Sequence, residues 1–195
     1  MTELPRSPVE IRLATLEDTH AIAEAHVASW RATYPGIVPQ NYIDSLKVEE
    51  FADRWRSSIV TGMVIYVADC GGMIYGFASG GSARAEIVDF SGELYAIYLS
   101  PGAHSQGIGS RLFWSLAEHL HRAGHRNMYV WVLEENPSRG FYERMGGSRL
   151  STAEIKIGGK LLTEISYGWP DLAAAMNTPK IPRFCPKIPR KPNKP

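Results

Sequence analysis

The sequence predicts an α+β protein, with mixed α/β connections, built on a central, mostly antiparallel twisted sheet of six or seven strands flanked by helices. Two observations lead to this class. Apolar β-rich stretches alternate with helical ones along the chain, and two pairs of such stretches are joined by a Gly-Gly turn. Strands joined by a tight turn pair antiparallel, whereas a helix between two strands allows a parallel crossover. We therefore expect helices on both faces of the sheet and one or two parallel crossovers.

The N-terminal part predicts one strand followed by helices. Residues 9–15 have the composition of a strand, and Thr15 with Asp18 three residues later forms a shortened capping box for a helix. Apolar residues then recur at helical spacing until Tyr-Pro-Gly at 34–36 stops the helix. Residues 48–60 form a second helical segment.

The middle of the chain predicts three strands and the clearest helix. Residues 63–80 divide into two strands around Gly71-Gly72, and residues 93–100 are nearly all apolar, as in a buried central strand. From residue 108 to 120 the apolar residues form one continuous helical stripe, and Gly124 ends that helix.

The last part of the folded region predicts a strand, a short helix and a hairpin. Residues 127–133 form another buried strand, and residues 136–147 form a short helix with a proline near its start and glycine after its end. Two strand-like runs, 153–157 and 161–169, then surround Gly158-Gly159.

We expect one domain over residues 1–178 and a Pro/Lys-rich tail over 179–195. The tail holds six of the thirteen prolines and repeats Pro-Lys-Ile-Pro-Arg, a composition that favours extended polyproline and buries no core. Its P-x-x-P pattern is typical of a ligand for aromatic grooves, or of an unstructured end. Six of the 21 basic residues lie there, so the rest has 15 basic against 20 acidic residues and a net charge of −5.

The totals exclude several classes of protein. A mildly acidic body does not indicate a nucleic-acid binder and suits a cationic small substrate. No run of about 18 apolar residues predicts a membrane span, and the first ten residues do not resemble a signal peptide. Cys70 and Cys185 make no disulfide framework, so we expect a cytoplasmic protein. His119, His121 and His125 do not share a helix face, and we expect no metal.

Two glycines stand at the entrance of the long helix, in the stretch His-Ser-Gln-Gly-Ile-Gly at 104–109. A helix N-terminus presents unpaired N–H groups, and glycine lets an anion approach them because no Cβ intervenes. A phosphate site and a simple tight connection are both compatible with this pattern. The stretch lacks the third glycine of a dinucleotide fingerprint and the Gly-Lys-Ser/Thr of a Walker loop.

The sequence resembles the GNAT superfamily of N-acetyltransferases over nearly all of residues 9–170. That family carries Gln/Arg-x-x-Gly-x-Gly/Ala at a strand-to-helix turn, which corresponds here to residues 104–109. It also carries an Asn and then a Phe-Tyr pair after the next strand, seen here as Asn136 and Phe141-Tyr142. Residues 11–37 look like the opening strand and first helices of the family.

The resemblance implies a site for acetyl-CoA as co-substrate. The pyrophosphate would lie on the N–H groups of the turn, and the pantetheine arm would pair with the strand at 97–99, which in the family splays from the next strand. Here the splay would separate 93–100 from 127–133, and a backbone N–H near Leu99 would polarise the thioester carbonyl. The implied coenzyme-binding residues are Ile97, Tyr98, Leu99, His104, Ser105, Gln106, Gly107, Ile108, Gly109, Ser110 and Asn136.

The resemblance also implies roles in the chemistry. Tyr142 occupies the family's position for the acid that protonates the leaving thiolate, although it would also serve to pack its helix on the sheet. Glu93 is a candidate base, or an ordinary exposed glutamate at a strand end. Trp30, Tyr34 and Tyr95 are candidates for the acceptor pocket, and for Trp30 packing against the sheet is the alternative.

The function predicted from these residues is transfer of the acetyl group of acetyl-CoA to a primary amine by direct attack. Cys70 has no histidine nearby in sequence to activate it, so no covalent intermediate is expected. The alternative is a non-catalytic domain that binds acyl-CoA as a signal. The acceptor stays open among antibiotics, polyamines, amino acids and peptides, and a homodimer is a further partner to consider.

His104 stands where the family usually has Arg or Gln. A guanidinium there would add a charge-assisted contact to phosphate that the imidazole does not supply. We expect His104→Arg to tighten acetyl-CoA binding, measured by calorimetry. Unchanged or weaker affinity would contradict this alignment of the turn.

Overall fold

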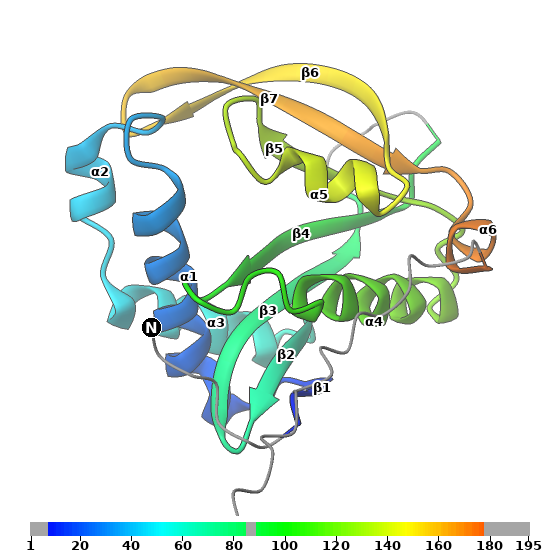
Figure 1. The fold of residues 1–195 in the computed structure, drawn as a ribbon, viewed down its shortest axis with the longest axis horizontal. Coiled ribbons are helices and arrows are strands. Elements are labelled where there is room, and N and C mark those ends of the chain that lie inside the picture. The colour runs from blue at the N-terminus through cyan, green and yellow to red at the C-terminus, as the bar shows by residue number, and fades with distance from the viewer. Residues whose placement is uncertain (1–7, 85–88, 178–195) are drawn as a thin grey trace, which may run out of the picture.

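The computed structural model describes residues 8–84 and 89–177, and in them seven strands form one sheet with helices on both faces (Figure 1). The sheet order is β1-β2-β3-β4-β5-β7-β6, and every neighbouring pair is antiparallel except β4 with β5. The predicted α+β class is confirmed, with a single parallel pair. The expected proline-rich tail lies outside the described residues.

The strands and helices fall close to the predicted ranges. The strands are β1 (Glu10–Leu13), β2 (Val64–Cys70), β3 (Met73–Ser82), β4 (Gly92–Leu99), β5 (Met128–Leu133), β6 (Ser148–Ile157) and β7 (Lys160–Trp169). The helices are α1 (Thr19–Thr33), α2 (Gln40–Asp44), α3 (Val48–Val60), α4 (Ile108–Arg122), α5 (Arg139–Arg144) and α6 (Leu172–Asn177). No helix among the described residues is both long and apolar enough to span a bilayer.

Two short helices, α2 and α6, were not predicted. Each is only one to two turns long, too short for a helical period to show in the sequence. Local signals start both of them. Pro39 precedes α2, and the Asp171 carboxylate accepts a hydrogen bond from the Ala174 N–H in the first turn of α6.

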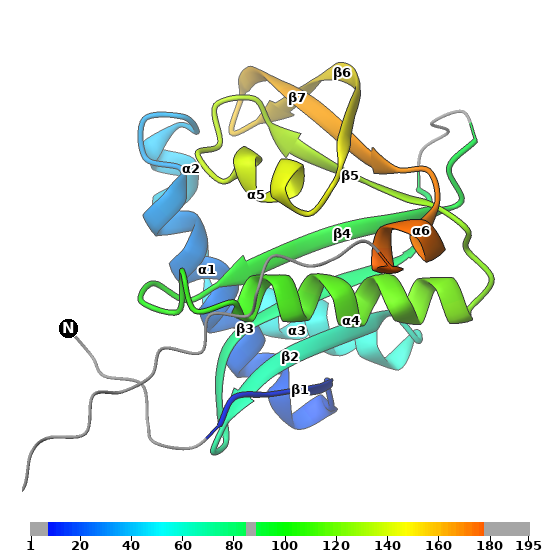
Figure 2. The same cartoon turned by 45° about the vertical axis from the view of Figure 1, so that its right-hand side comes forward.

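Helices cover the two faces of the sheet unequally. On one face α4 packs across β2, β3 and β4 with the apolar stripe predicted from the sequence, and α6 packs against α4 (Figure 2). On the other face α1 and α3 pack on each other and α1 lies over β3 and β4. The strands β5, β6 and β7 extend beyond this second layer of helices (Figure 1).

A third apolar cluster joins α1 and α2 to β5 and β7. Its buried members are Tyr34, Val38, Ile43, Leu133 and Leu162. The turn of the β6–β7 hairpin packs against α2, where a Cβ on Gly158 would lie 2.7 Å from the Tyr42 Cβ. Lys160 Nζ donates to the Ile37 carbonyl at 2.8 Å. These contacts hold the β6–β7 hairpin against α2 and the segment that follows α1.

The pairing of β4 with β5 is very short. Gly92 pairs with Met128 and Glu93 with Tyr129, and no further pair follows. The two strands then diverge, β4 staying with β3 and β5 with β7 (Figures 1 and 2). The predicted splay between these strands is confirmed.

The predicted capping box anchors the start of the first helical layer. The Asp18 carboxylate accepts from the Thr15 N–H at 2.7 Å and from the Thr15 hydroxyl at 3.0 Å. Arg12 donates to both oxygens of Asp18, at 2.7 and 2.8 Å, and to Asp69 in β2 at 2.9 Å. Hydrogen bonds from Arg12 lower the pKa of Asp18 from 3.8 to about 2.

We expect Asp18→Asn to lower the free energy of unfolding at pH 7 by about 1.5–3 kcal/mol, the usual contribution of a hydrogen bond to a charged group. A depressed pKa stabilises the fold above the unfolded-state pKa, and this contribution disappears as the pH falls from about 4 to about 2. Urea unfolding of both proteins at pH 7 and at pH 2.5 measures the effect. A difference that stays the same at both pH values would contradict the ion-pair account.

Candidate active site

A cavity of about 710 Å³ occupies the space where β4 and β5 diverge. Residues 95–99 of β4 line one wall and residues 130–133 of β5 line the other. The turn before α4 and the helix α5 close it on one side of the sheet, and the end of α1 and the β6–β7 hairpin close it on the other.

The turn before α4 has an unusual backbone conformation where it borders the cavity. Ser105 and Gly107 both have left-handed backbone angles, with φ of 62° and 75°. Left-handed residues in such a turn direct N–H groups into a concave nest that suits an anion. For a non-glycine residue such as Ser105 this conformation is strained by about 1 kcal/mol or more. The nest lies at the N-terminus of the fifteen-residue α4, where the helix dipole adds positive potential.

The residues of the turn are divided between the cavity and the core. His104, Ser105, Gly107, Gly109 and Ser110 line the cavity. A Cβ on Gly109 would stand in ordinary contact with Phe141 at 3.4 Å and with Leu99 at 3.5 Å, so this glycine is packed against both side chains.

Two predicted residues of the turn do not line the cavity. Gln106 donates from Nε2 to the Gly102 carbonyl at 3.0 Å, and Ile108 is buried in the core under α4. Their contribution to the site is therefore through the backbone of the turn.

Tyr142 lies on the cavity wall although its side chain is 7% exposed. Its ring packs edge-on against Phe141 and stacks on Tyr167, with centroids 5.4 and 5.9 Å away. Burial, and then the nearby Tyr98, raise its pKa above the ordinary value for tyrosine. The hydroxyl therefore holds its proton at neutral pH and can donate it.

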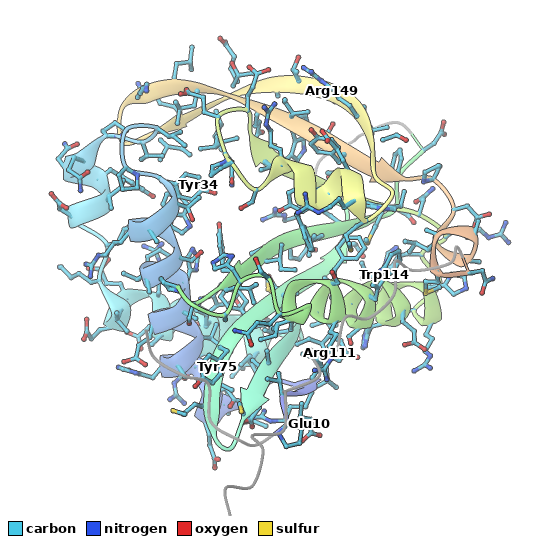
Figure 3. The ribbon with its side chains drawn as sticks, viewed as in Figure 1. Glu10, Tyr34, Tyr75, Arg111, Trp114 and Arg149 are labelled. Carbon is cyan, nitrogen blue, oxygen red and sulfur yellow. The ribbon has the colours of Figure 1, made fainter. Side chains whose placement is uncertain are left out.

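Tyr34 and Asn136 meet across the cavity from segments far apart in the sequence. Asn136 Nδ2 donates to the Tyr34 hydroxyl at 3.0 Å, and both side chains are buried. Burial raises the pKa of Tyr34 to about 12. Tyr34 lies at the end of α1 (Figure 3), one turn after Trp30, whose ring centroid is 4.6 Å from its own. The predicted coenzyme and acceptor residues thus touch each other here.

Tyr98 also lines the cavity, together with its neighbours Ile97 and Leu99. Its ring stacks on the buried His26 of α1 at 4.6 Å. Burial raises the pKa of the Tyr98 hydroxyl and lowers that of His26 to about 4, so both side chains are neutral at pH 7. The side chain of Tyr98 therefore joins β4 to the helical layer.

Glu93 is buried at the point where β4 and β5 meet. Its exposed fraction is 2%, so it is not the exposed strand-end glutamate that the sequence offered as an alternative. Arg84 donates to it from the backbone N–H at 2.8 Å and from Nη2 at 2.5 Å, and the Tyr129 hydroxyl donates at 3.1 Å. Glu93 is not among the residues that line the cavity.

Tyr95 and Arg84 form a stacked pair at the same end of the cavity. The Arg84 guanidinium lies 4.1 Å from the centre of the Tyr95 ring, and the Tyr95 hydroxyl donates to the Ser82 carbonyl at 2.6 Å. Both residues line the cavity. Tyr95 was predicted in the acceptor pocket, whereas Arg84 was not predicted at all.

Glu164 is a second cavity residue that the sequence reading missed. It lies in β7 and is half-buried. Burial, and then the charge of Glu93, raise its pKa, while Arg84 lowers it by less. The sequence did hold a signal for this residue. In a strand Leu162, Glu164 and Ser166 share one face and Ile165 and Tyr167 lie on the other, so an acid stands on a partly buried strand face.

The histidines in and after α4 have different hydrogen-bond partners. The Tyr66 hydroxyl lies 3.3 Å from the Nδ1 of His119, and the Ser91 hydroxyl lies 3.2 Å from the Nδ1 of His125. Residues 8–84 and 89–177 contain no cluster of three or more His, Cys, Asp or Glu side chains that could hold a metal ion.

Comparisons with known proteins agree on the kind of protein that the chain resembles. A family model described as FR47-like protein matches residues 75–155. YuaI, an uncharacterized N-acetyltransferase of Bacillus subtilis, is 43% identical over 166 residues, covering 85% of this chain and 95% of the relative. A probable N-acetyltransferase of Mycobacterium tuberculosis is 30% identical over 145 residues, covering 71% of this chain and 79% of the relative.

Solved structures share the fold at lower sequence identity. The PaiA N-acetyltransferase of Thermoplasma acidophilum in complex with coenzyme A has a TM-score of 0.66 at 24% identity, covering 80% of this chain and 98% of its own. YncA of Salmonella typhimurium, a putative acetyltransferase with its cofactor acetyl-CoA, has a TM-score of 0.65 at 20% identity, covering 85% and 95%. At these identities the likeness is one of fold.

Proposed function

The chain belongs to the GNAT superfamily of N-acetyltransferases, and from this premise we propose that it transfers the acetyl group of acetyl-CoA to a primary amine of a small molecule or peptide. One observation carries the proposal. A single cavity runs from the backbone nest before α4, through the gap between β4 and β5, to the buried hydroxyl of Tyr142.

The residues of the nest fit a diphosphate. Ser105 and Gly107 have the left-handed backbone angles of an anion-binding nest, and both line the cavity together with Gly109. Beyond Glu93 the strand β4 has no partner on the side of β5, so its backbone offers hydrogen bonds to an extended ligand arm. Asn136 and Ser138 line the cavity near α5. These features support the proposed coenzyme site.

Acetyl-CoA, when bound, supplies an acetyl group activated as a thioester. Tyr142 is proposed to give its proton to the departing sulfur as the carbon–sulfur bond breaks, since burial keeps its hydroxyl protonated at neutral pH. The backbone N–H near Leu99 is proposed to stabilise negative charge on the carbonyl oxygen.

The other side of the cavity is proposed to take the amine. We call this part the acceptor side, lined by Trp30, Tyr34, Tyr95, Trp131, Leu133, Ile155 and Ile157. Its aromatic faces suit a cation on an apolar body. The role of Glu93 as a base stays a prediction. Its carboxylate accepts hydrogen bonds from Arg84 and Tyr129, and Glu93 is not among the residues that line the cavity.

Two measurements test the proposal. Calorimetry with coenzyme A and acetyl-CoA measures binding, and release of thiol from acetyl-CoA in the presence of an amine panel measures transfer. We expect binding and amine-dependent thiol release. Binding without turnover on any amine would favour the alternative, a non-catalytic acyl-CoA-binding domain, and absence of binding at millimolar coenzyme would overturn the proposed site.

We expect Tyr142→Phe to lower kcat by about 100-fold, the lower end for loss of a general acid, with little change in coenzyme affinity. Steady-state kinetics with the best acceptor of the panel measures this. Tyr167→Phe is the matched control, because it removes a hydroxyl from the ring stacked on Tyr142, and that hydroxyl donates to Glu143 rather than to the cavity. Equal kcat for Tyr142→Phe and the wild type would remove the proposed role.

A further inference from the structure

One carboxylate faces the acceptor side of the cavity. Glu164 is the only acidic side chain among the described residues that line the cavity. In the sheet it pairs with Leu133 of β5 and with Ala153 of β6, so both neighbouring strands set an uncharged residue beside it. Ile155 and Ile157 of β6 line the same cavity. The carboxylate thus stands in largely apolar surroundings.

The charge of Glu164 is not cancelled by a close ion pair within the described residues. The charged groups that influence it are Arg84 and Glu93, and these two are hydrogen-bonded to each other. From α1, Trp30 and Tyr34 line the same cavity, and Tyr34 is neutral at pH 7 because its pKa is about 12. The Tyr95 hydroxyl and the Tyr129 hydroxyl are likewise committed to Ser82 and Glu93. Glu164 therefore contributes negative charge to the acceptor side.

An amine acceptor must be deprotonated in the site before it can react. Its ammonium, with a pKa of ~10, cannot attack a carbonyl carbon until it has lost a proton. A half-buried carboxylate beside the amine attracts the ammonium first and then accepts the proton. Its burial helps, because a pKa raised toward neutrality makes the carboxylate a stronger base.

We propose that Glu164 holds the ammonium of the acceptor and takes its proton during acetyl transfer, an inference that rests on the proposed function. The amine nitrogen forms a bond to the acetyl carbon as the carbon–sulfur bond breaks. Before attack the ammonium gives one proton to a Glu164 carboxylate oxygen, and Glu164 releases it to water. As the carbon–sulfur bond breaks, the thiolate receives the proton of Tyr142, and the second proton lost by nitrogen passes through water to restore the Tyr142 hydroxyl.

The same surroundings assign a class of acceptor. Beside Glu164, the residues of the acceptor side are all aromatic or aliphatic, Trp131, Leu133 and Ile157 among them. An amine on an apolar body satisfies both the carboxylate and these walls, whereas a second ammonium would be buried without a partner. We therefore expect 2-phenylethylamine and tryptamine to be better acceptors than spermidine.

Glu164→Gln tests the inference, because it removes the charge and the basicity while keeping the shape. We expect kcat/KM for 2-phenylethylamine to fall about 100-fold at pH 7. The deficit is expected to shrink to within several-fold near pH 10, where about half of the amine is already unprotonated and needs no base for its first proton. Coenzyme A affinity, measured by calorimetry, is expected to stay within twofold of wild type, which also shows that the variant is folded.

Glu154→Gln is the matched control. Glu154 lies in the neighbouring strand β6, is exposed and does not line the cavity, so this variant loses the same charge without affecting the site. A Glu164→Gln deficit that is absent or independent of pH would overturn the role of Glu164, and a preference of the wild type for spermidine would overturn the acceptor class. Absence of coenzyme binding by the wild type would instead overturn the proposed function.

Discussion

The site depends on the stop in pairing between β4 and β5 after Gly92 and Glu93. A strand edge with unpaired N–H and C=O groups is normally a liability, because it offers a template to other chains. Here the edge faces inward, between two halves of one sheet, and borders the cavity that α1 and α5 also line. Where β4 and β5 still pair, the buried Glu93 accepts hydrogen bonds from Arg84 and Tyr129. The opening is therefore a built feature of the sheet centre, and the cavity follows from it.

Features that depend on near neighbours in the chain could be predicted from the sequence. The stripe of α4, the capping box of Thr15 and Asp18, and the two Gly-Gly hairpins each involve residues within a few positions. The resemblance to a family placed Tyr142, Asn136 and the strand at 97–99 together, and the structure brings all of them to one cavity. Local chemistry and motif order were sufficient for these elements.

Features that depend on register across the sheet could not be predicted. In the β3–β4 ladder Ser79 pairs with Ala96 and Gly80 with Leu94, so Tyr95 is an extra residue on β4. Such a bulge changes which face the following residues occupy, and strand composition does not reveal it. The pairing of Glu93 with Arg84 and the position of Glu164 opposite Leu133 depend on registers of this kind. The sequence therefore predicted Glu93 as a site residue but not its partner Arg84, and it did not predict Glu164.

The contact of Gly158 with Tyr42 has a consequence for how relatives of this chain diverge. The hairpin turn meets α2 so closely that any side chain at 158 would displace one of the two segments. Because Ile155 and Ile157 of the same hairpin line the cavity, exchanges at either position would shift this wall while leaving the nest and Tyr142 in place. Evolution, or an engineer, could thus retune which molecules enter without rebuilding the chemistry, provided that the turn and the helix change as a pair.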